Sequence, residues 1–206
     1  MNATYTQEKN VAEDLAMEKM AVKGYEEVWK VTSASVGLQA IIAVHNTKLG
    51  FALGGIRIYP YANFDLALTD VLRLAQGMTY KAAIAQVGLG GGKSVIIADP
   101  KKDKTPALLQ RFASAIEKLQ GRYVCAEDVG CNMDDVQVVN SVTKYVVGLP
   151  QDGGDPGRFT AWGVFRGIQS VIFSLDGTTS LVGKKIAVQG LGNVGKHLLE
   201  YLFWAG

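Results

Sequence analysis

Two lysines stand in surroundings that are unusual for a charged side chain. Lys81 follows Gly77-Met78-Thr79-Tyr80 and precedes an alanine-rich stretch, and Lys93 follows three consecutive glycines. A lysine that is removed from water and placed near another cation loses its proton more readily, so it can act as a base near neutral pH. Its charged partner can bind a carboxylate. The alternative is that both are exposed lysines, as most lysines are.

Asp128 is a candidate for proton transfer. It follows the predicted strand 123–126, and α/β proteins bind ligands beyond the carboxyl ends of their strands. Neighbouring side chains on an extended chain point to opposite faces, so Glu127 and Asp128 do not both face one cleft. The alternative is that Asp128 caps the turn that follows through Gly130.

A glycine pattern near the end of the chain is typical of dinucleotide binding. Residues 190–195 read Gly-Leu-Gly-Asn-Val-Gly, between the predicted strand 185–189 and a predicted helix. In that setting Gly190 permits a tight turn, Gly192 lets a pyrophosphate approach the backbone, and Gly195 lets the helix pack on the sheet. The helix N-terminus supplies the anion site. A structural turn is the alternative, because the acidic residue expected about 20 positions later would lie after the printed sequence.

A second glycine run, at 88–92 before Lys93-Ser94, suggests a nucleoside triphosphate loop but does not fit one. That loop requires a glycine where Val87 stands. The expected order of elements is also reversed, with a helix before the loop and a strand after it. We therefore do not expect a nucleotide triphosphatase.

Composition excludes several classes of protein. The 206 residues include 24 glycines, 48% apolar residues and 19% charged residues, which is enough apolar material for a core and argues against disorder. A net charge of +2 gives no reason to expect a nucleic-acid partner. No apolar run approaches the ~18 residues of a membrane span, and no signal peptide is recognisable, so we expect a cytoplasmic protein. Two cysteines and two distant histidines predict neither a disulfide scaffold nor a metal site.

The expected elements alternate between helix and strand, which indicates an α/β fold. Strands are predicted at about 26–32, 38–45, 94–98, 123–126, 144–147 and 185–189. Helices are predicted over the first ~25 residues, from 64 to about 82, from 106 to 120, from 132, from a cap at Thr160, and from 193. Glycine-rich turns are expected at 50–55 and 88–92, and a hinge at 148–158.

Four segments in one order resemble the glutamate/leucine/phenylalanine/valine dehydrogenase family. They are Leu53-Gly54-Gly55-Ile56-Arg57, Gly77-Met78-Thr79-Tyr80-Lys81, Gly90-Gly91-Gly92-Lys93-Ser94-Val95-Ile96 and Ala126-Glu127-Asp128-Val129-Gly130, and the 190–195 pattern follows them. The resemblance covers about residues 25–206. It implies an α/β substrate-binding and assembly domain over 1–150, then a hinge and the start of an NAD-binding Rossmann domain over 151–206, truncated after its first strand and helix.

The resemblance also implies an activity: NAD-linked, reversible oxidative deamination of an L-amino acid to a 2-oxo acid and ammonia, by a homo-oligomer. Lys93 is then similar to the catalytic lysine that activates the attacking water. Asp128 is similar to the residue that moves protons to and from the substrate amine. Lys81 resembles the lysine that binds the substrate carboxylate, aided by the backbone of Gly54 and Gly55.

The cofactor and the substrate side chain are assigned on the same resemblance. The pyrophosphate of NAD is expected at Gly190, Gly192, Asn193, Val194 and Gly195, and the nicotinamide amide near Thr160. Leu53, Met78 and Ala126 are expected at the substrate, where Leu53 and Ala126 resemble small, apolar pocket positions.

The Ala126 methyl shortens the pocket, because phenylalanine-specific members tend to have glycine there. This favours a branched-chain substrate, leucine first, by only ~1–3 kcal/mol. A phenylalanine or valine dehydrogenase stays open as an alternative. So does an incomplete fragment that serves only assembly or binding, and we expect the 206-residue chain alone to be inactive.

Overall fold

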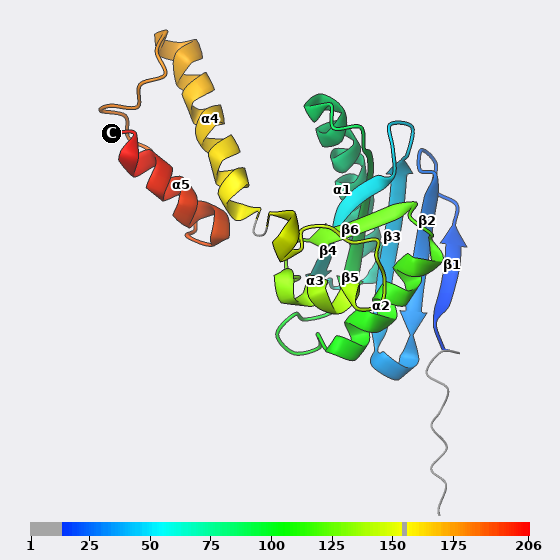
Figure 1. Ribbon diagram of the computed structural model, residues 1–206. Helices are drawn as coiled ribbons and strands as arrows, with labels where there is room; N and C mark the ends of the chain where they lie inside the picture. The colour runs from blue at the N-terminus through cyan, green and yellow to red at the C-terminus, as the bar shows by residue number, and fades with distance from the viewer. Residues whose placement is uncertain (1–13, 154–155) are drawn as a thin grey trace, which may run out of the picture. The chain divides into compact units, whose positions relative to one another are not determined.

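The computed structural model describes residues 14–153 and 156–206. The chain divides into two compact units, one ending at Asp152 and the other beginning at Gly153. Each unit is described by itself, and both are drawn in Figure 1. Helices and strands mix throughout the first unit, which confirms the α/β class. None of the described helices is long and apolar enough to cross a membrane.

The first unit is a six-stranded sheet with helices on both faces (Figure 1). In spatial order the strands are β1 (Ala16–Met20), β2 (Glu27–Ser33), β3 (Leu38–Asn46), β5 (Gly90–Ile97), β4 (Ala52–Tyr59) and β6 (Tyr123–Glu127). The pairs from β1 to β5 are antiparallel, and β4 is parallel to both β5 and β6. The helices are α1 (Phe64–Ala85), α2 (Pro106–Lys118) and α3 (Met133–Asn140), with 3-10 turns at Ala34–Val36 and Pro150–Asp152.

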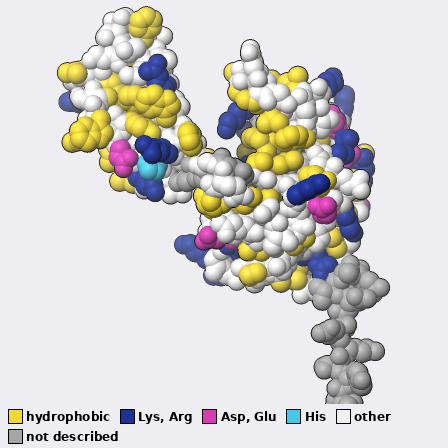
Figure 2. Space-filling model, in the orientation of Figure 1, with side chains coloured by type: hydrophobic (Ala, Val, Ile, Leu, Met, Phe, Trp, Pro, Cys, Tyr) yellow, Lys and Arg dark blue, Asp and Glu magenta, His cyan; other side chains and the backbone are white. Residues whose placement is uncertain are grey.

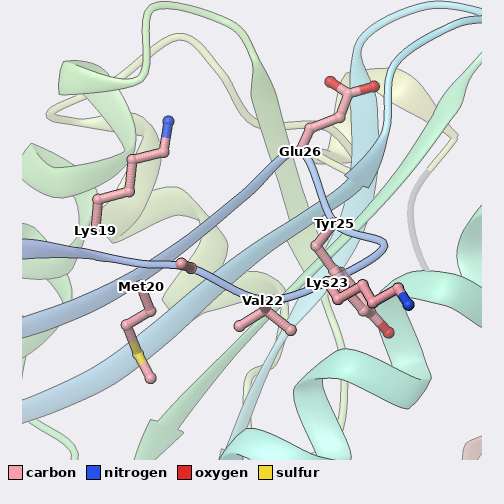
Figure 3. Close-up of a pocket in the computed structure, with 7 residues that line it drawn as sticks. Lys19, Met20, Val22, Lys23, Tyr25 and Glu26 are labelled. Atoms are coloured by element: carbon pink, nitrogen blue, oxygen red, sulfur yellow. The ribbon is translucent and has the colours of Figure 1, made fainter.

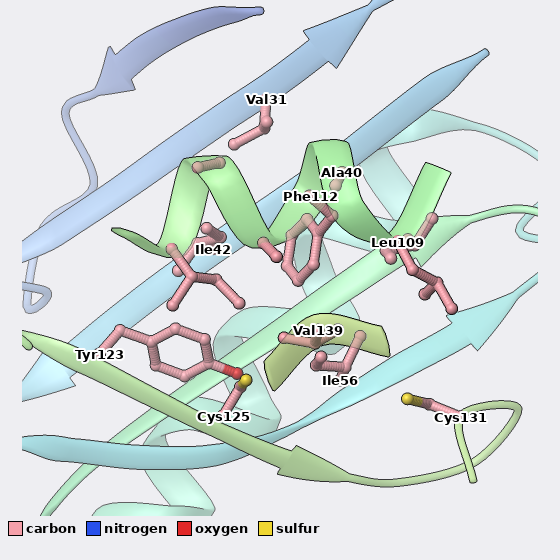
Figure 4. Close-up of a cluster of buried hydrophobic side chains, with 14 of the residues drawn as sticks. Val31, Ala40, Ile42, Ile56, Leu109, Phe112, Tyr123, Cys125, Cys131 and Val139 are labelled. Atoms are coloured by element: carbon pink, nitrogen blue, oxygen red, sulfur yellow. The ribbon is translucent and has the colours of Figure 1, made fainter. Parts of the chain in front are cut away.

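Two apolar layers hold the sheet to its helices. The larger layer lies between the sheet and α2 and α3, where Ile42, Ile56, Phe112, Tyr123 and Val139 meet (Figure 4). The smaller layer lies under α1 and is lined on the helix side by alanines and a valine; its buried members are Val28, Ile41, Ala43, Ala67, Val71, Ala75 and Val95. Small side chains let α1 approach the sheet closely, which matters for the site described below.

The three helix starts of the first unit follow their capping residues. The Asn63 side chain accepts a hydrogen bond from the backbone N–H of Leu66, and Thr105 does the same for Leu108 ahead of a proline in the first turn. Asn132 forms a reciprocal capping box with Asp135. These local signals explain why the predicted starts are confirmed.

The predicted leading helix is wrong where the structure describes it. Residues 1–13 lie outside the described part of the chain, and Ala16–Met20 is the edge strand β1. Leu15 and Met17 are two residues apart and pack against the same core, as alternate residues of a strand do. Their spacing with Val11 fits a helix as well, so the short apolar pattern could not decide between the two.

The glycine-rich turns predicted at 50–55 and 88–92 are mostly strand. The chain is extended from Ala52 and from Gly90, and the glycines there are close-packing positions. A Cβ built on Gly54 would lie 1.8 Å from the carbonyl oxygen of Gly92. The positive φ angles that make true turns occur just outside these strands, at Gly50 and Gly88.

Two other predicted strands do not form ladders. Residues 144–147 contribute a single bridge, between Val146 and Cys125. Residues 185–189 have no regular secondary structure and no sheet partner among the described residues of the second unit. A strand requires a neighbour to satisfy its backbone groups, so an apolar run alone does not make one.

The second unit pairs α4 (Gly157–Asp176) with α5 (Asn193–Trp204) around a small core of Ala161, Phe165, Leu181 and Leu198. The predicted cap at Thr160 is wrong. The helix begins three residues earlier, after Pro156, and the Thr160 N–H donates to the Pro156 carbonyl. Large apolar side chains are exposed in both units (Figure 2), including Phe203 and Trp204 on α5.

Candidate active site

The face of the sheet that carries α1 holds four of the predicted site residues, Leu53, Gly55, Lys93 and Ala126. Gly91 packs directly beneath Thr79 of α1, and Lys93, two residues along β5, therefore points to the same face. The register pairs Leu53 with Gly91 and Ile56 with Ser94, so Gly55 lies beside Lys93. On its other side Gly55 pairs with Ala126. Because α1 packs mainly over β3 and β5, this face is less covered over β4 and β6.

Gly55 allows Lys93 to reach Asp128 across an intervening strand. The Lys93 Nζ atom lies 3.2 Å from Asp128 Oδ2, although the two residues come from β5 and from the end of β6 with β4 between them. A Cβ built on Gly55 would lie 2.7 Å from the Asp128 Cβ and 2.5 Å from the Glu127 carbonyl oxygen. The bare glycine thus keeps open the space in which the ion pair forms.

Arg57 binds the same carboxylate, although it is not among the site residues predicted from the sequence. Its Nε lies 2.9 Å from Asp128 Oδ2, and its Nη1 lies 2.9 Å from Asp70 Oδ2 on α1. Tyr61 donates its hydroxyl to the same Asp70 oxygen at 2.6 Å. Arg57 could have been found by strand alternation from Gly55. Asp70 carries no such signal, because only folding brings α1 to this edge of β4.

The charges in this cluster shift one another's pKa. Burial is the largest influence on the pKa of Lys93 and lowers it, and the attraction of Asp128 does not outweigh that effect. Burial alone would raise the pKa of Asp128, but Lys93 and Arg57 outweigh it, so the pKa of Asp128 is lowered and the group is ionised. For Arg57, the hydrogen bonds and charges of Asp128 and Asp70 outweigh burial and raise its pKa. Of the two cations, Lys93, whose side chain is 6% exposed, is the one whose pKa is lowered.

The structure distinguishes buried from exposed lysines and shows what holds the Asp128 carboxylate. Lys93 is buried and is not a surface lysine, whereas Lys81 is exposed near the end of α1. The cation that lowers the pKa of Lys93 is Arg57, where the sequence had suggested Lys81. The Asp128 carboxylate is held by side chains, and the turn after it is closed instead by backbone hydrogen bonds between Asp128 and Cys131. Leu53, Met78 and Ala126 are half-buried, and their roles stay predictions.

Two surface hollows lie in the first unit near these elements. One, of about 240 Å³, adjoins the cluster and is lined by Arg57, Tyr59, Tyr61, Asp70 and Val129. The other lies at the turn between β1 and β2, where Lys19, Met20, Val22, Lys23, Tyr25 and Glu26 surround it (Figure 3). None of the predicted site residues lines either hollow. Arg57 and Asp70 of the first hollow bind into the cluster that holds Asp128 and Lys93, so the cluster at Gly55 is the candidate active site.

The glycine pattern of the second unit forms a tight turn into a helix. Gly190 has a φ of +85°, and a Cβ built on Gly195 would lie 2.0 Å from the Gly190 carbonyl oxygen. Gly192 is the N-cap of α5, which begins at Asn193, and a Cβ on Gly192 would meet nothing within 4 Å. Gly195 therefore makes room for the turn itself, and the helix start is accessible beside Gly192.

The first unit matches a known protein family in sequence. A sequence model described as the Glu/Leu/Phe/Val dehydrogenase, dimerisation domain, matches residues 26–145. The chain belongs to this family. The match contains β2 to β6 and every member of the Lys93, Asp128, Arg57 and Asp70 cluster.

Individual relatives of the Glu/Leu/Phe/Val dehydrogenase family agree. Leucine dehydrogenase of Bacillus subtilis is 48% identical over 88% of this chain and 51% of its own. Phenylalanine dehydrogenase of Lysinibacillus sphaericus is 46% identical over 90% of this chain and 49% of its own. The crystal structure of L-tryptophan dehydrogenase from Nostoc punctiforme matches with a TM-score of 0.68 and 45% identity, over 88% of this chain and 52% of that one. The chain spans about half the length of the relatives it matches.

Proposed function

We propose that this chain is the substrate-binding and assembly part of an NAD-dependent amino-acid dehydrogenase. The reaction would convert a branched-chain L-amino acid, leucine by preference, with water to the 2-oxo acid and ammonium. The observation that carries the proposal is the buried Lys93 held against Asp128 across Gly55, inside the segment that matches the family. The relatives are named as amino-acid dehydrogenases, which supports the class of reaction, but their names specify more than one amino-acid substrate.

Lys93 and Asp128 divide the proton transfers between them. Oxidation of the amine gives an imine, and water must then lose a proton as it attacks the imino carbon. Lys93 accepts that proton, because burial lowers its pKa and makes the neutral amine accessible. Asp128 is ionised, so it can accept a proton from the substrate ammonium group and return one to the departing ammonia.

The substrate carboxylate and side chain have separate binding groups. Lys81 binds the carboxylate, with help from the backbone of Gly54 and Gly55. Leu53, Met78 and Ala126 line the side-chain pocket, which is consistent with the half-buried state of all three. The Ala126 methyl favours leucine over an aromatic substrate by ~1–3 kcal/mol, so a phenylalanine-type or valine-type specificity is the alternative that kinetic comparison would reveal.

The second unit fits a dinucleotide pyrophosphate. The positive φ at Gly190, the accessible Gly192 and the helix beginning at Asn193 together present backbone N–H groups to an anion. Val194 and Gly195 complete the turn, and Thr160 is assigned to the nicotinamide amide. Bound NAD would supply the acceptor for the hydride from the substrate α-carbon. We therefore assign residues 1–150 to substrate and assembly, and 151–206 to the hinge and the start of the NAD-binding domain.

Assembly into a homo-oligomer is part of the same proposal, supported by the description of the matched segment as a dimerisation domain. Light scattering after size exclusion measures it directly. A chain that forms a stable oligomer without turnover, even when extended, would favour the alternative of an assembly module.

The test of the reaction measures NADH absorbance with leucine, valine and phenylalanine, using the 206-residue chain and a longer product of the same gene. Turnover by the longer product with leucine as the best substrate is the expected result. No turnover by that product with any amino acid would overturn the enzyme proposal. Loss of turnover in the shorter chain alone would show that the remaining half is required.

A binding measurement tests the substrate site in the chain as it is. We expect calorimetry to detect 4-methyl-2-oxopentanoate, and expect Lys81→Met to weaken its binding by roughly tenfold through loss of one charged hydrogen bond. Lys102→Met is the matched control, because the Lys102 side chain is 80% exposed and lies in a loop beside Asp99. Equal binding by both variants would reject the role of Lys81.

A further inference from the structure

One oxygen of Asp128 is shared by two cations. Lys93 Nζ lies 3.2 Å and Arg57 Nε 2.9 Å from the same atom, Oδ2. The other oxygen, Oδ1, makes none of the hydrogen bonds found among the described residues. The carboxylate is therefore fixed by one oxygen and presents the second. A group that exchanges protons with a substrate amine requires such an arrangement, because a rotating carboxylate would not keep its lone pairs aligned.

Arg57 is itself held in place from α1. Its Nη1 atom binds Asp70 Oδ2 at 2.9 Å, and Tyr61 donates its hydroxyl to that oxygen at 2.6 Å. The planar guanidinium thus joins two carboxylates, one on the helix and one beyond β6, through two different nitrogens. The single ammonium group of a lysine could not reproduce this geometry.

The balance of charge around Lys93 depends on this arrangement. Asp128 and Asp70 are anions near Lys93, Arg57 is the cation near it, and the facing residue on β3 is the uncharged Ala43. With Arg57 removed, a buried ammonium group would face two carboxylates and no neighbouring cation. The pKa of such a lysine would rise, and a smaller fraction of it would be the neutral base near neutral pH.

We propose that Arg57 is a positioning residue for this site, which orients Asp128 through Oδ2 and offsets the two carboxylates so that Lys93 can release its proton. The proposal rests on the proposed function for the roles of Lys93 and Asp128. Its electrostatic content concerns the ionisation of Lys93 in this chain and does not require turnover. Asp70, with Tyr61, keeps Arg57 at Asp128.

The test is an NMR titration of the 206-residue chain labelled with ¹³C at the lysine Cε carbons. The Lys93 signal is identified by its loss in Lys93→Met. Arg57→Met is expected to raise the titration midpoint of Lys93 by about one pH unit or more, which is a tenfold loss of neutral amine at a given pH. Arg73→Met is the matched control, because Arg73 lies exposed on α1, and it should leave the midpoint unchanged. An unchanged midpoint in Arg57→Met would overturn the proposal.

A second variant separates electrostatics from loss of structure. Asp70→Asn keeps a side-chain oxygen that can accept the Arg57 hydrogen bond and hold Arg57 at Asp128, but it removes one anion, so it is expected to lower the Lys93 midpoint. If the cluster merely fell apart, both variants would move Lys93 up toward the ordinary lysine pKa of ~10.4. A rise in Asp70→Asn would therefore reject the proposal, even if Arg57→Met failed to fold.

Activity of a longer gene product distinguishes failure of this proposal from failure of the proposed function. In an active product, Arg57→Met should move the pH profile of kcat/KM to higher pH, and Arg57→Lys should restore it only in part. Opposite midpoint shifts in the two variants without any dehydrogenase turnover would support the coupling and reject the function. Turnover with an unmoved pH profile would keep the function and reject the role of Arg57.

Discussion

The Tyr123 hydroxyl group makes a buried polar contact with the backbone near the candidate site. It is completely buried, donates to the carbonyl oxygen of Gly54 at 2.6 Å, and lies 2.9 Å from Ser94 Oγ. Because the tyrosine proton is directed to the carbonyl, the serine hydroxyl donates to the tyrosine oxygen. Tyr123 thus connects β6 to β4 and β5 in the layer opposite Lys93. Its replacement by phenylalanine removes only this oxygen.

The expected loss follows from the two groups left behind. Tyr123→Phe leaves the Gly54 carbonyl and the Ser94 hydroxyl without this partner inside a packed layer, which costs about 1–3 kcal/mol of the free energy of unfolding. Adding Ser94→Ala removes one of the stranded groups. The double variant should therefore lose less stability than the sum of the two single variants, because removing both partners of a buried hydrogen bond is close to neutral.

Native-state hydrogen exchange of the most protected β4 and β5 amides measures the free energy of unfolding of the first unit alone. Tyr80→Phe is the matched control: the Tyr80 side chain is exposed, so a change within ~0.5 kcal/mol is expected. A loss of less than ~0.5 kcal/mol in the free energy of unfolding of Tyr123→Phe would refute the reasoning. So would a double variant whose loss equals the sum of the losses in Tyr123→Phe and Ser94→Ala.

Three further predictions test other parts of the structure. Gly55→Ala places a Cβ 2.5 Å from a β6 backbone oxygen and should lower the free energy of unfolding by ~1–3 kcal/mol. Gly77→Ala has open space around it and should raise the free energy of unfolding. Similar thermal unfolding temperatures for the two variants would contradict this prediction. Hydrogen bonds from Ser35 and Ser33 lower the pKa of Asp14 to about 2, so its stabilising effect is present above the unfolded value of ~3.9 and is lost as pH falls toward 2. Asp14→Asn should flatten that acid limb in circular dichroism. Burial raises the pKa of Cys131 to about 12 and that of Cys125 further, so a thiol reagent at pH 8 should modify the native chain at least roughly tenfold more slowly than the unfolded chain.

The parts of the fold that sequence predicts are those with a local physical cause. At the starts of α1, α2 and α3, a capping side chain accepts a hydrogen bond from the backbone N–H three residues later, and all three predicted starts are confirmed. The sequence predicts turns at the glycines of β4 and β5 because the reason for these glycines is not local: the missing side chain at Gly54 makes room for Gly92, 38 positions away. No periodicity within either segment reports that contact.

The same distinction applies to the candidate site. Unusual neighbours in the sequence and the family resemblance point to Lys93 and Asp128, and the structure brings them together at 3.2 Å. Arg57 and Asp70 were missed as site residues. An arginine after a strand glycine and an aspartate on an amphipathic helix look like solvated charges until the packing of α1 on the sheet places them 2.9 Å apart. Strand alternation from Gly55 could have pointed to Arg57, but the importance of Asp70 depends on tertiary structure, which composition and spacing do not report.

The two cations of the cluster respond to the same surroundings in opposite ways, and this difference supports the proposed role of Lys93 as the proton carrier. Two carboxylates outweigh burial for Arg57, whose pKa is raised, while burial outweighs the carboxylates for Lys93, whose pKa is lowered. A guanidinium keeps its charge in proteins, whereas an ammonium group at net disadvantage can lose its proton. Packing alone does not favour a buried lysine under such conditions, and groups retained against packing are the ones expected at functional sites. Arg57 therefore supplies a permanent charge, and Lys93 is the member of the pair able to change its own.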